Sequence, residues 1–235
     1  PLRDAPAAET EAPLLRVESG KGEKVELTGL ALTSHGKQVF DELYSGSAEV
    51  KLDAMKVIGP GGAALDATGV HYAGEVPVDG EFVDAIARIG ADRARISGFE
   101  YGPVHYDVSF RHLHGPTLAA LTRELRRVTE KQAKSADPAA ALAAFDDPAL
   151  QSALRQLLLA KPRLVIDQIS ATTPQGPFSI KGEAHFTNLH SSDLSGPSLM
   201  GLLAKLEAQA DISVPAAWAS LAGSRVLPKS PDAED

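Results

Sequence analysis

Two histidines, His112 and His114, are the clearest candidates for chemistry, because they form an H-x-H pattern at the end of an alternating segment. Residues two apart on a strand point to the same side, and a same-side pair of imidazoles suits a metal ion such as zinc. The same two residues also suit a polar turn that satisfies backbone groups at the start of a helix. A metal-dependent hydrolase is therefore one hypothesis, but we favour the polar turn and assign neither a metal nor a cofactor.

A second candidate is the run His190, Ser191, Ser192 and Asp193, which contains the residue types of a hydrolase triad. Catalytic triads are assembled from distant segments, and the chain has no G-x-S-x-G nucleophile elbow. We therefore predict a loop and name no catalytic residue. Four further histidines are isolated in sequence and are expected on wet strand faces or in turns: His35, His71, His105 and His185.

Three other features admit both a functional and a structural interpretation. The glycines of segment 59–62 lack the Lys-Ser/Thr ending of a phosphate loop, which favours a hairpin turn. Arg123, Arg126 and Arg127 could dock an acidic partner or a lipid headgroup, or simply form a solvated helix face. Trp218, the single tryptophan, is expected to fill the core.

Composition excludes several classes of function. The net charge of -8 argues against nucleic acid and against adhesion to an anionic membrane surface. The absence of cysteine excludes thiol catalysis, disulfides and cysteine-type zinc sites. We recognise no signal peptide and no apolar run of the roughly 20 residues that span a bilayer. Because the chain starts at Pro1, we expect that the natural start is missing.

Alternating apolar and polar residues, interrupted by glycine and proline, predict a series of strands and hairpins. The predicted strands cover 14–19, 24–33, 48–58, 63–73, 93–101, 104–112, 163–172, 177–187 and 210–214. Helical spacing predicts helices at 81–89, from residue 116 onward, from residue 148 onward and at 198–207, with a short turn near 39–44. The expected fold class is α+β, with antiparallel hairpins in a long curved sheet and amphipathic helices mainly on one face.

An internal repeat is predicted from two similar stretches. Phe110–His114 matches Phe186–His190, and Gly115–Leu118 matches Gly196–Leu199. A strand-turn-strand-helix unit cannot cover its own apolar side, so copies should share one sheet. The expected organisation is a flexible lead-in at 1–13, one domain at 14–226 and a frayed tail at 227–235. The domain would hold units at about 48–90, 93–134 and 163–210, and a helical insertion at 138–160.

Three stretches carry a family resemblance: VSFRHLHGPTLAALTREL, DDPALQSALRQLL, and KPRLVIDQISATTPQGPFSIKGEAHFTNL continuing to LLAKLEAQADISVPAAW. With them the chain resembles the YdgA-like bacterial family of unknown function, mainly in its second half. The resemblance implies a periplasmic protein anchored to the inner membrane through an N-terminal segment, without agreed catalytic residues. Family members commonly have Asp at the positions of His114 and His190, which implies a turn or capping role.

The leading hypothesis is a non-catalytic periplasmic domain of an inner-membrane-anchored envelope protein, with a binding or scaffolding role. Its expected partners are an envelope protein or a second copy, and nucleic acid is not expected. The second hypothesis is a carrier that holds a lipid or quinone-like ligand between sheet and helices. It rests on small and aliphatic residues in the predicted sheet: Ala94, Ile96, Gly98, Ile180, Gly182 and Ala184.

Overall fold

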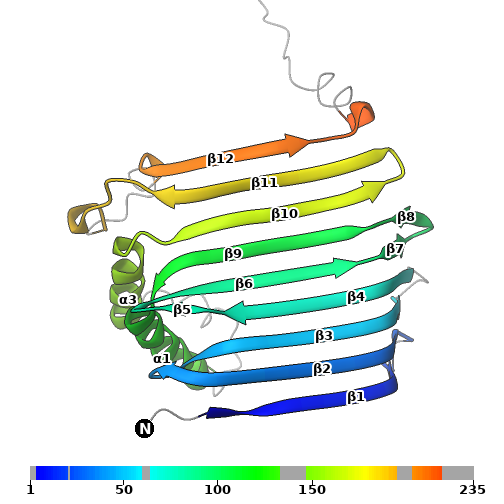
Figure 1. The fold of residues 1–235 in the computed structure, drawn as a ribbon, viewed down its shortest axis with the longest axis horizontal. Coiled ribbons are helices and arrows are strands. Elements are labelled where there is room, and N and C mark those ends of the chain that lie inside the picture. The colour runs from blue at the N-terminus through cyan, green and yellow to red at the C-terminus, as the bar shows by residue number, and fades with distance from the viewer. Residues whose placement is uncertain (1–3, 21, 60–63, 133–146, 195–202, 219–235) are drawn as a thin grey trace, which may run out of the picture.

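The computed structural model of the chain describes residues 4–20, 22–59, 64–132, 147–194 and 203–218. These residues form one twelve-stranded antiparallel sheet with helices at one end (Figure 1). The main path of the sheet runs β1-β2-β3-β4-β6-β9-β10-β11-β12. Two short additions lie off this path, since β5 pairs with β6, and β7 pairs with β4 and β8.

The chain is mostly β, with little helix beside the sheet. The strands are β1 (Asp4–Glu18), β2 (Lys24–Phe40), β3 (Leu43–Ile58), β4 (Ala64–Val76), β5 (Val78–Asp79), β6 (Phe82–Ala91), β7 (Arg93–Ile96), β8 (Phe99–Tyr101), β9 (Val104–His114), β10 (Arg163–Thr173), β11 (Gly176–Phe186) and β12 (Leu206–Ser213). The helices are α1 (Gly115–Gln132), α3 (Pro148–Leu159) and the 3-10 turn η3 (Ser191–Leu194). The antiparallel sheet was predicted, but its share of the chain is larger than the predicted α+β class implies.

The two faces of the sheet differ in polarity. Residues paired directly across an antiparallel ladder share a face. One continuous row of paired residues crosses nine strands: Thr10, Leu32, Val50, Tyr72, Ile89, Tyr106, Ile169, Ile180 and Ile212. The neighbouring row lies on the opposite side: Glu9, Thr33, Glu49, Ala73, Arg88, Asp107 and Gln168. We call these two sides the apolar face and the polar face.

At two glycines the alternation of apolar and polar residues along a strand is interrupted and resumes at shifted positions. In β2 the apolar positions run to Leu27 and resume at Leu30, and Gly29 between them is left-handed with φ 63°. A Cβ at Gly29 would lie 2.1 Å from a carboxylate oxygen of Asp53, so only glycine fits there. Gly69 in β4 has the same conformation, with φ 61°. A left-handed residue changes the direction in which the side chains after it point. The apolar positions of the sequence shift at the same two glycines.

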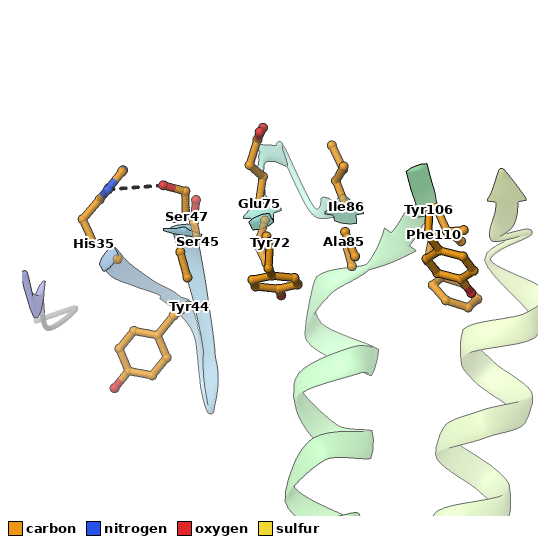
Figure 2. Close-up of a pocket in the computed structure, with 17 residues that line it drawn as sticks. His35, Tyr44, Ser45, Ser47, Tyr72, Glu75, Ala85, Ile86, Tyr106 and Phe110 are labelled. Carbon is orange, nitrogen blue, oxygen red and sulfur yellow. Dashed lines mark hydrogen bonds between the residues drawn. The ribbon is translucent and has the colours of Figure 1, made fainter. Parts of the chain in front are cut away.

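The core is small and lies where the helices meet the sheet. Val83, Leu113 and Leu157 form its buried centre, and side chains from the β2–β3 turn and α1 pack around them. Among the described residues, the largest side chains with less than 2% exposure are those of Val83 and Ser109. The helices lie on the side of the apolar face, as predicted, but they cover only one end of it (Figures 1 and 2). The rest of the described sheet is a single layer.

Ion pairs fasten helix α1 to the sheet. The Arg123 guanidinium lies 2.8 Å from the Asp41 carboxylate, and that of Arg126 lies 2.5 Å from Glu42. Both acidic residues belong to the turn between β2 and β3, where Glu42 is left-handed with φ 63°. The predicted helical turn near 39–44 is therefore a hairpin turn that docks against α1.

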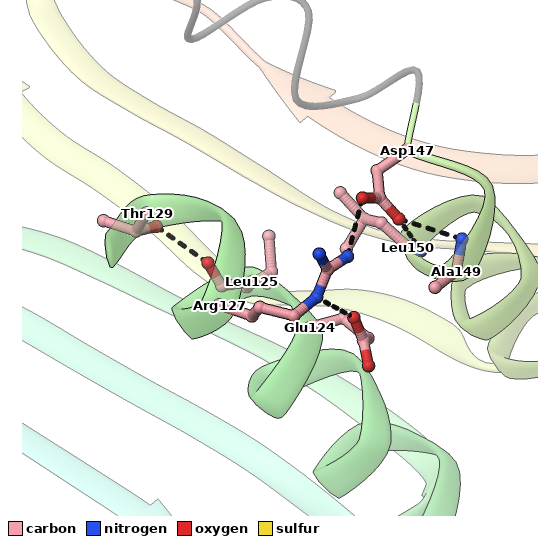
Figure 3. A network of polar contacts seen from close by, with 7 residues as sticks. All are labelled: Glu124, Leu125, Arg127, Thr129, Asp147, Ala149 and Leu150. Atoms are coloured by element: carbon pink, nitrogen blue, oxygen red, sulfur yellow. Dashed lines mark hydrogen bonds and ion pairs between the residues drawn. The ribbon is translucent and has the colours of Figure 1, made fainter. Parts of the chain in front are cut away.

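A second polar network joins the two helices (Figure 3). Arg127 of α1 donates hydrogen bonds to Glu124 at 2.7 Å and to Asp147 at 2.6 Å. Asp147 also caps α3, since its carboxylate accepts a hydrogen bond from the backbone N–H of Ala149 at 2.9 Å. The hydrogen bond from Arg127 lowers the pKa of Asp147, and the same contacts raise the pKa of Arg127. The Asp147 carboxylate therefore both caps α3 and pairs with Arg127, so the N-terminus of α3 lies against α1.

Two further predicted elements were wrong. Segment 81–89, predicted as a short helix, lies in strand β6, which pairs with β4 and β9. Its apolar residues fit helical spacing, but Val83, Ala85, Ala87 and Ile89 also alternate, and the neighbouring strands decide between the patterns. The predicted flexible lead-in is also strand from Asp4 onward, because β1 pairs along β2. An edge strand tolerates the prolines and charges of this segment.

The structure shows no repeated units among its described residues. The predicted strand 93–101 is a separate hairpin, β7–β8, and β9 pairs with β6 and β10 instead. After Phe110 the chain enters the long helix α1, whereas after Phe186 it enters the 3-10 turn η3. Strand β12 begins at Leu206, four residues before the predicted strand. The predicted tail at 227–235 and the first half of the predicted helix at 198–207, residues 198–202, fall outside the described residues. The end of that predicted helix was wrong, because Leu206 and Glu207 begin strand β12.

Candidate functional site

The apolar face contains a hollow of about 500 Å³ above β2, β3, β4, β6 and β9. Small residues form its floor: Gly36, Gly46, Ala48, Gly74, Ala85 and Ala87. Four aromatic rings lie around them: Tyr44, Tyr72, Tyr106 and Phe110. Figure 2 shows these rings on the side of the sheet where the helices lie, with His35, Ser47 and Glu75 on the other side. We call this space the apolar hollow.

Strand register explains the depth of the apolar hollow. Ala48 pairs with Gly74, and Gly74 pairs with Ala87, so three small residues lie side by side on one face. The next row on that face has the large side chains Tyr72 and Tyr106. A row of small residues beside a row of rings leaves a groove across the strands. A Cβ at Gly74 would lie only 2.5 Å from the Tyr72 hydroxyl oxygen, so the ring leans over this glycine.

The rings of the hollow remain half exposed. Tyr44, Tyr72, Tyr106 and Phe110 keep 46%, 38%, 47% and 51% of their surface accessible. Soluble proteins rarely leave large contiguous apolar patches uncovered unless the patch binds a ligand, a protein or a membrane. The backbone groups beneath are paired in the sheet ladder. The site therefore offers mainly apolar contact.

The apolar face continues beyond the hollow. A smaller hollow of about 140 Å³ lies over β10, β11 and β12, and its lining includes Leu164, Ile166, Gly182, Ala184 and Ala208. Leu164 pairs with Phe110, which connects the linings of the two hollows. At the far end Trp218 lies against Phe178, with ring centroids 5.7 Å apart. The tryptophan thus covers part of the apolar face.

Comparison with known protein families gives one match, which covers almost the whole chain. The family is described as a bacterial protein of unknown function, and its model matches residues 4–234. The chain belongs to the DUF945 family. No curated protein and no solved structure matches this DUF945 chain. In the part of the DUF945 chain that the structure describes, no helix is both long and apolar enough to cross a membrane.

The predicted ligand-lining residues fall in different places. Ile180, Gly182 and Ala184 lie on the apolar face of the DUF945 sheet, and the last two line the smaller hollow. Ala94 and Ile96 belong to the short strand β7, and Gly98 belongs to the turn after it. The apolar hollow is lined by strand and hairpin residues rather than by helices.

Sequence reasoning missed the aromatic rim of the apolar hollow. The predicted helical turn near 39–44 includes Tyr44, and the predicted strand 63–73 includes Tyr72 but ends before Gly74. The alternation of Val70, Tyr72, Gly74 and Val76 was visible in the sequence. It placed a glycine between large residues on one face, which is the signal of a hollow in a sheet.

A bulge lies at His112, the first histidine of the H-x-H pattern. His112 is left-handed with φ 59°, and the register between β6 and β9 shifts beside it. Its ring stacks on Phe82 with centroids 3.8 Å apart, and the His114 ring meets the same phenylalanine edge-on at 5.8 Å. His114 Nδ1 also contacts Thr117 Oγ1 at 2.7 Å. His114 therefore contacts the first turn of α1, as the polar-turn hypothesis expects. No group of three or more metal-ligating side chains occurs among the residues that the structure describes.

Segment 190–193 forms a capped turn. The Asp193 carboxylate accepts a hydrogen bond from the backbone N–H of His190 at 2.7 Å. It also accepts one from the Lys205 ammonium at 2.5 Å, and this bond is the main cause of a lowered pKa of Asp193. In this run of triad-type residues, the Asp193 carboxylate therefore bonds a lysine and the His190 backbone N–H.

The remaining polar candidates have structural partners. The three arginines of α1 form the ion pairs described above. His35 contacts Ser47 at 3.3 Å, and His71 contacts the Gly69 carbonyl at 3.2 Å. His185 Nε2 lies 3.7 Å from Glu207. The glycine-rich turn at 60–62 falls outside the described residues.

Proposed function

We propose that this DUF945 chain binds a lipid-class ligand through its apolar face, with an acyl chain lying in the apolar hollow. The supporting observation is the row of apolar residues that crosses nine strands beside a groove floored by alanine and glycine. Binding pockets for small ligands measure about 300–1,000 Å³, a range that includes this hollow.

The chemistry of the face favours an acyl chain over a peptide. A peptide lying on the sheet would bury its own N–H and C=O groups without partners, because the sheet's backbone groups already pair with each other. An acyl chain has no such groups and loses nothing on desolvation. The hydroxyl groups of Tyr44, Tyr72 and Tyr106 are the polar atoms closest to the rim, and they suit the end of a chain near water.

The expected affinity is moderate. A buried methylene group contributes about 0.8 kcal/mol, so about eight of them contribute about 6 kcal/mol. That free energy corresponds to a Kd of tens of micromolar before the cost of immobilising the chain. Such binding suits an exchangeable ligand.

The proposed setting is the bacterial envelope. The resemblance to the YdgA-like family supports a periplasmic domain, held at the inner membrane by an N-terminal anchor, with a binding rather than a catalytic role. An alkaline phosphatase fusion at the C-terminus of the full-length protein tests this setting, because the reporter is active only after export. An inactive fusion that is stably produced would contradict it.

The binding proposal is tested by native mass spectrometry of the purified protein with a long-chain fatty acid added above the expected Kd. We expect a bound fatty acid in the wild type and its loss in Ala87→Trp, which fills the floor of the apolar hollow. Ala73→Trp is the matched control, since Ala73 lies one strand away on the polar face. A wild type that carries no lipid, or that appears as a tight dimer closed by this face, would overturn the proposal.

A further inference from the structure

A second hollow, of about 340 Å³, lies on the polar face at the end of the sheet near the helices, and no step above uses it. It is lined by Pro77, Val78, Asp79, Phe82, Asp84, Arg111, His112 and Arg163. We call it the polar hollow. Basic residues come from β9 and β10, and acidic residues come from β5 and β6.

Its basic side is built from two arginines that oppose each other directly. Arg111 of β9 pairs with Arg163 of β10 in the register, so both side chains leave the same face at adjacent positions. Like charges directly opposite in a sheet destabilise it. An anion between the two guanidiniums would reduce this repulsion, because guanidinium N–H groups form strong hydrogen bonds with a phosphate or carboxylate.

One of the two arginines is held in place and the other is available. Arg111 donates from Nε to Ser109 Oγ at 3.0 Å and from Nη2 to Asp167 at 2.7 Å. Ser109 is fully buried and donates its own hydroxyl to Asp167 at 2.9 Å, which anchors the group. Arg163 forms no ion pair or side-chain hydrogen bond with any described residue. The hollow thus has a fixed guanidinium beside one that can close on a ligand.

The opposite side carries two carboxylates. Asp84 accepts a hydrogen bond from the backbone N–H of His112 at 2.8 Å, and the His112 ring lies flat on Phe82. Asp79 has no ion-pair partner among the described side chains. These acids disfavour a ligand that carries negative charge alone and favour one that also has an ammonium group.

We propose that the polar hollow binds an aminoalkyl phosphate, with the phosphate between Arg111 and Arg163 and the ammonium group toward Asp79 and Asp84. The same chemistry occurs in a free phosphoethanolamine and in the headgroup of a phosphatidylethanolamine. The proposal stands apart from the lipid proposal, because the polar and apolar hollows open on opposite faces of the sheet.

Isothermal titration calorimetry with phosphoethanolamine tests the site, and inorganic phosphate and ethanolamine serve as separate probes. We expect phosphoethanolamine to bind and Arg163→Gln to weaken it about tenfold. Arg155→Gln should leave binding unchanged, because Arg155 is an exposed arginine of α3 that contacts Gln151. Asp79→Asn should reduce the preference for phosphoethanolamine over inorganic phosphate.

Three outcomes would overturn the proposal in whole or in part. If phosphoethanolamine does not bind at millimolar concentration, the proposed site is refuted. If Arg163→Gln and Arg155→Gln lose affinity for phosphoethanolamine equally, the assignment to the arginine pair is refuted. If inorganic phosphate and phosphoethanolamine bind with equal affinity, and Asp79→Asn does not change this, the proposed contact of the ammonium group with the carboxylates is refuted. A water-soluble dihexanoyl phosphatidylethanolamine then distinguishes the sources: tighter binding than phosphoethanolamine identifies the lipid headgroup, and weaker binding identifies the free compound.

Discussion

Phe110 offers a direct test of how the apolar hollow binds. Its side chain lies at the rim with 51% of its surface exposed, so a bound chain can still cover much of the ring. An aromatic side chain presents about 200 Å², which leaves about 100 Å² to be covered. At about 25 cal/mol per Å² this area contributes about 2.5 kcal/mol if covered completely and about 1.2 kcal/mol if covered on one side.

The corresponding change, Phe110→Ala, should weaken ligand binding between about eightfold and about seventyfold. Titration with a long-chain fatty acid that carries a polarity-sensitive fluorophore measures the Kd. Because half of the ring is already in water, the change should lower the free energy of unfolding only modestly, by about 1 kcal/mol. Thermal unfolding of the same variant checks that the sheet remains intact.

Phe99→Ala provides the matched control. Phe99 is a phenylalanine of similar exposure, 58%, in the short strand β8, and it does not line the hollow. We expect its Kd to stay within about twofold of the wild type. A change below twofold in Phe110→Ala, or equal weakening in both variants, would refute the assignment of the acyl chain to the apolar hollow.

Three further variants test the rest of the structure. Leu113→Ala removes a side chain that is 7% exposed and should lower the free energy of unfolding by about 2–5 kcal/mol in urea titration, against about 1 kcal/mol for Leu125→Ala on the exposed side of α1. The hydrogen bond from Arg127 lowers the pKa of Asp147, so their ion pair stabilises the fold above about pH 4. This stabilisation decreases as the pH falls through the lowered pKa of Asp147. The difference in Tm between wild type and Asp147→Asn should therefore be present at pH 7 and shrink below about pH 4. Gly74→Val adds methyl groups to the floor of the hollow and should abolish binding in the fluorescence titration while the far-UV circular dichroism spectrum stays unchanged.

Strand alternation predicted much of the sheet. The pattern of β9 and β11 assigned Phe110 and Ile180 to an apolar side, and the register places both on the apolar face. The same local rule failed for 81–89, where helical and strand periods overlap. Pairing with β4 and β9 decides that segment, and long-range pairing is not encoded in a short window.

The histidine pair shows why a site is harder to predict than a strand. Alternation describes His112 and His114 as part of a regular strand. The structure has a bulge with a left-handed backbone at His112, whose N–H donates a hydrogen bond to Asp84, and both histidine rings contact Phe82. Asp84 lies 28 residues earlier in the chain, so the residues next to the histidines in the sequence do not predict the bulge.

The hollow was missed for a related reason. A glycine in one strand becomes a groove only when alanine or glycine stands beside it in the neighbouring strands. Gly74 meets Ala48 and Ala87 through the register of three strands, two of which were predicted and one of which was taken for a helix. The error in β6 therefore concealed the site.

Photo-cross-linking in living cells tests the central claim most directly. A photoreactive amino acid is placed at Ala87 on the floor of the apolar hollow, or at Ala73 on the polar face of the adjacent strand. Lipid-class ligand binding predicts that the probe at 87 captures a lipid, detected by mass spectrometry, and that the probe at 73 does not. Capture of a second copy of the chain at 87, or equal lipid capture at both positions, would contradict the account.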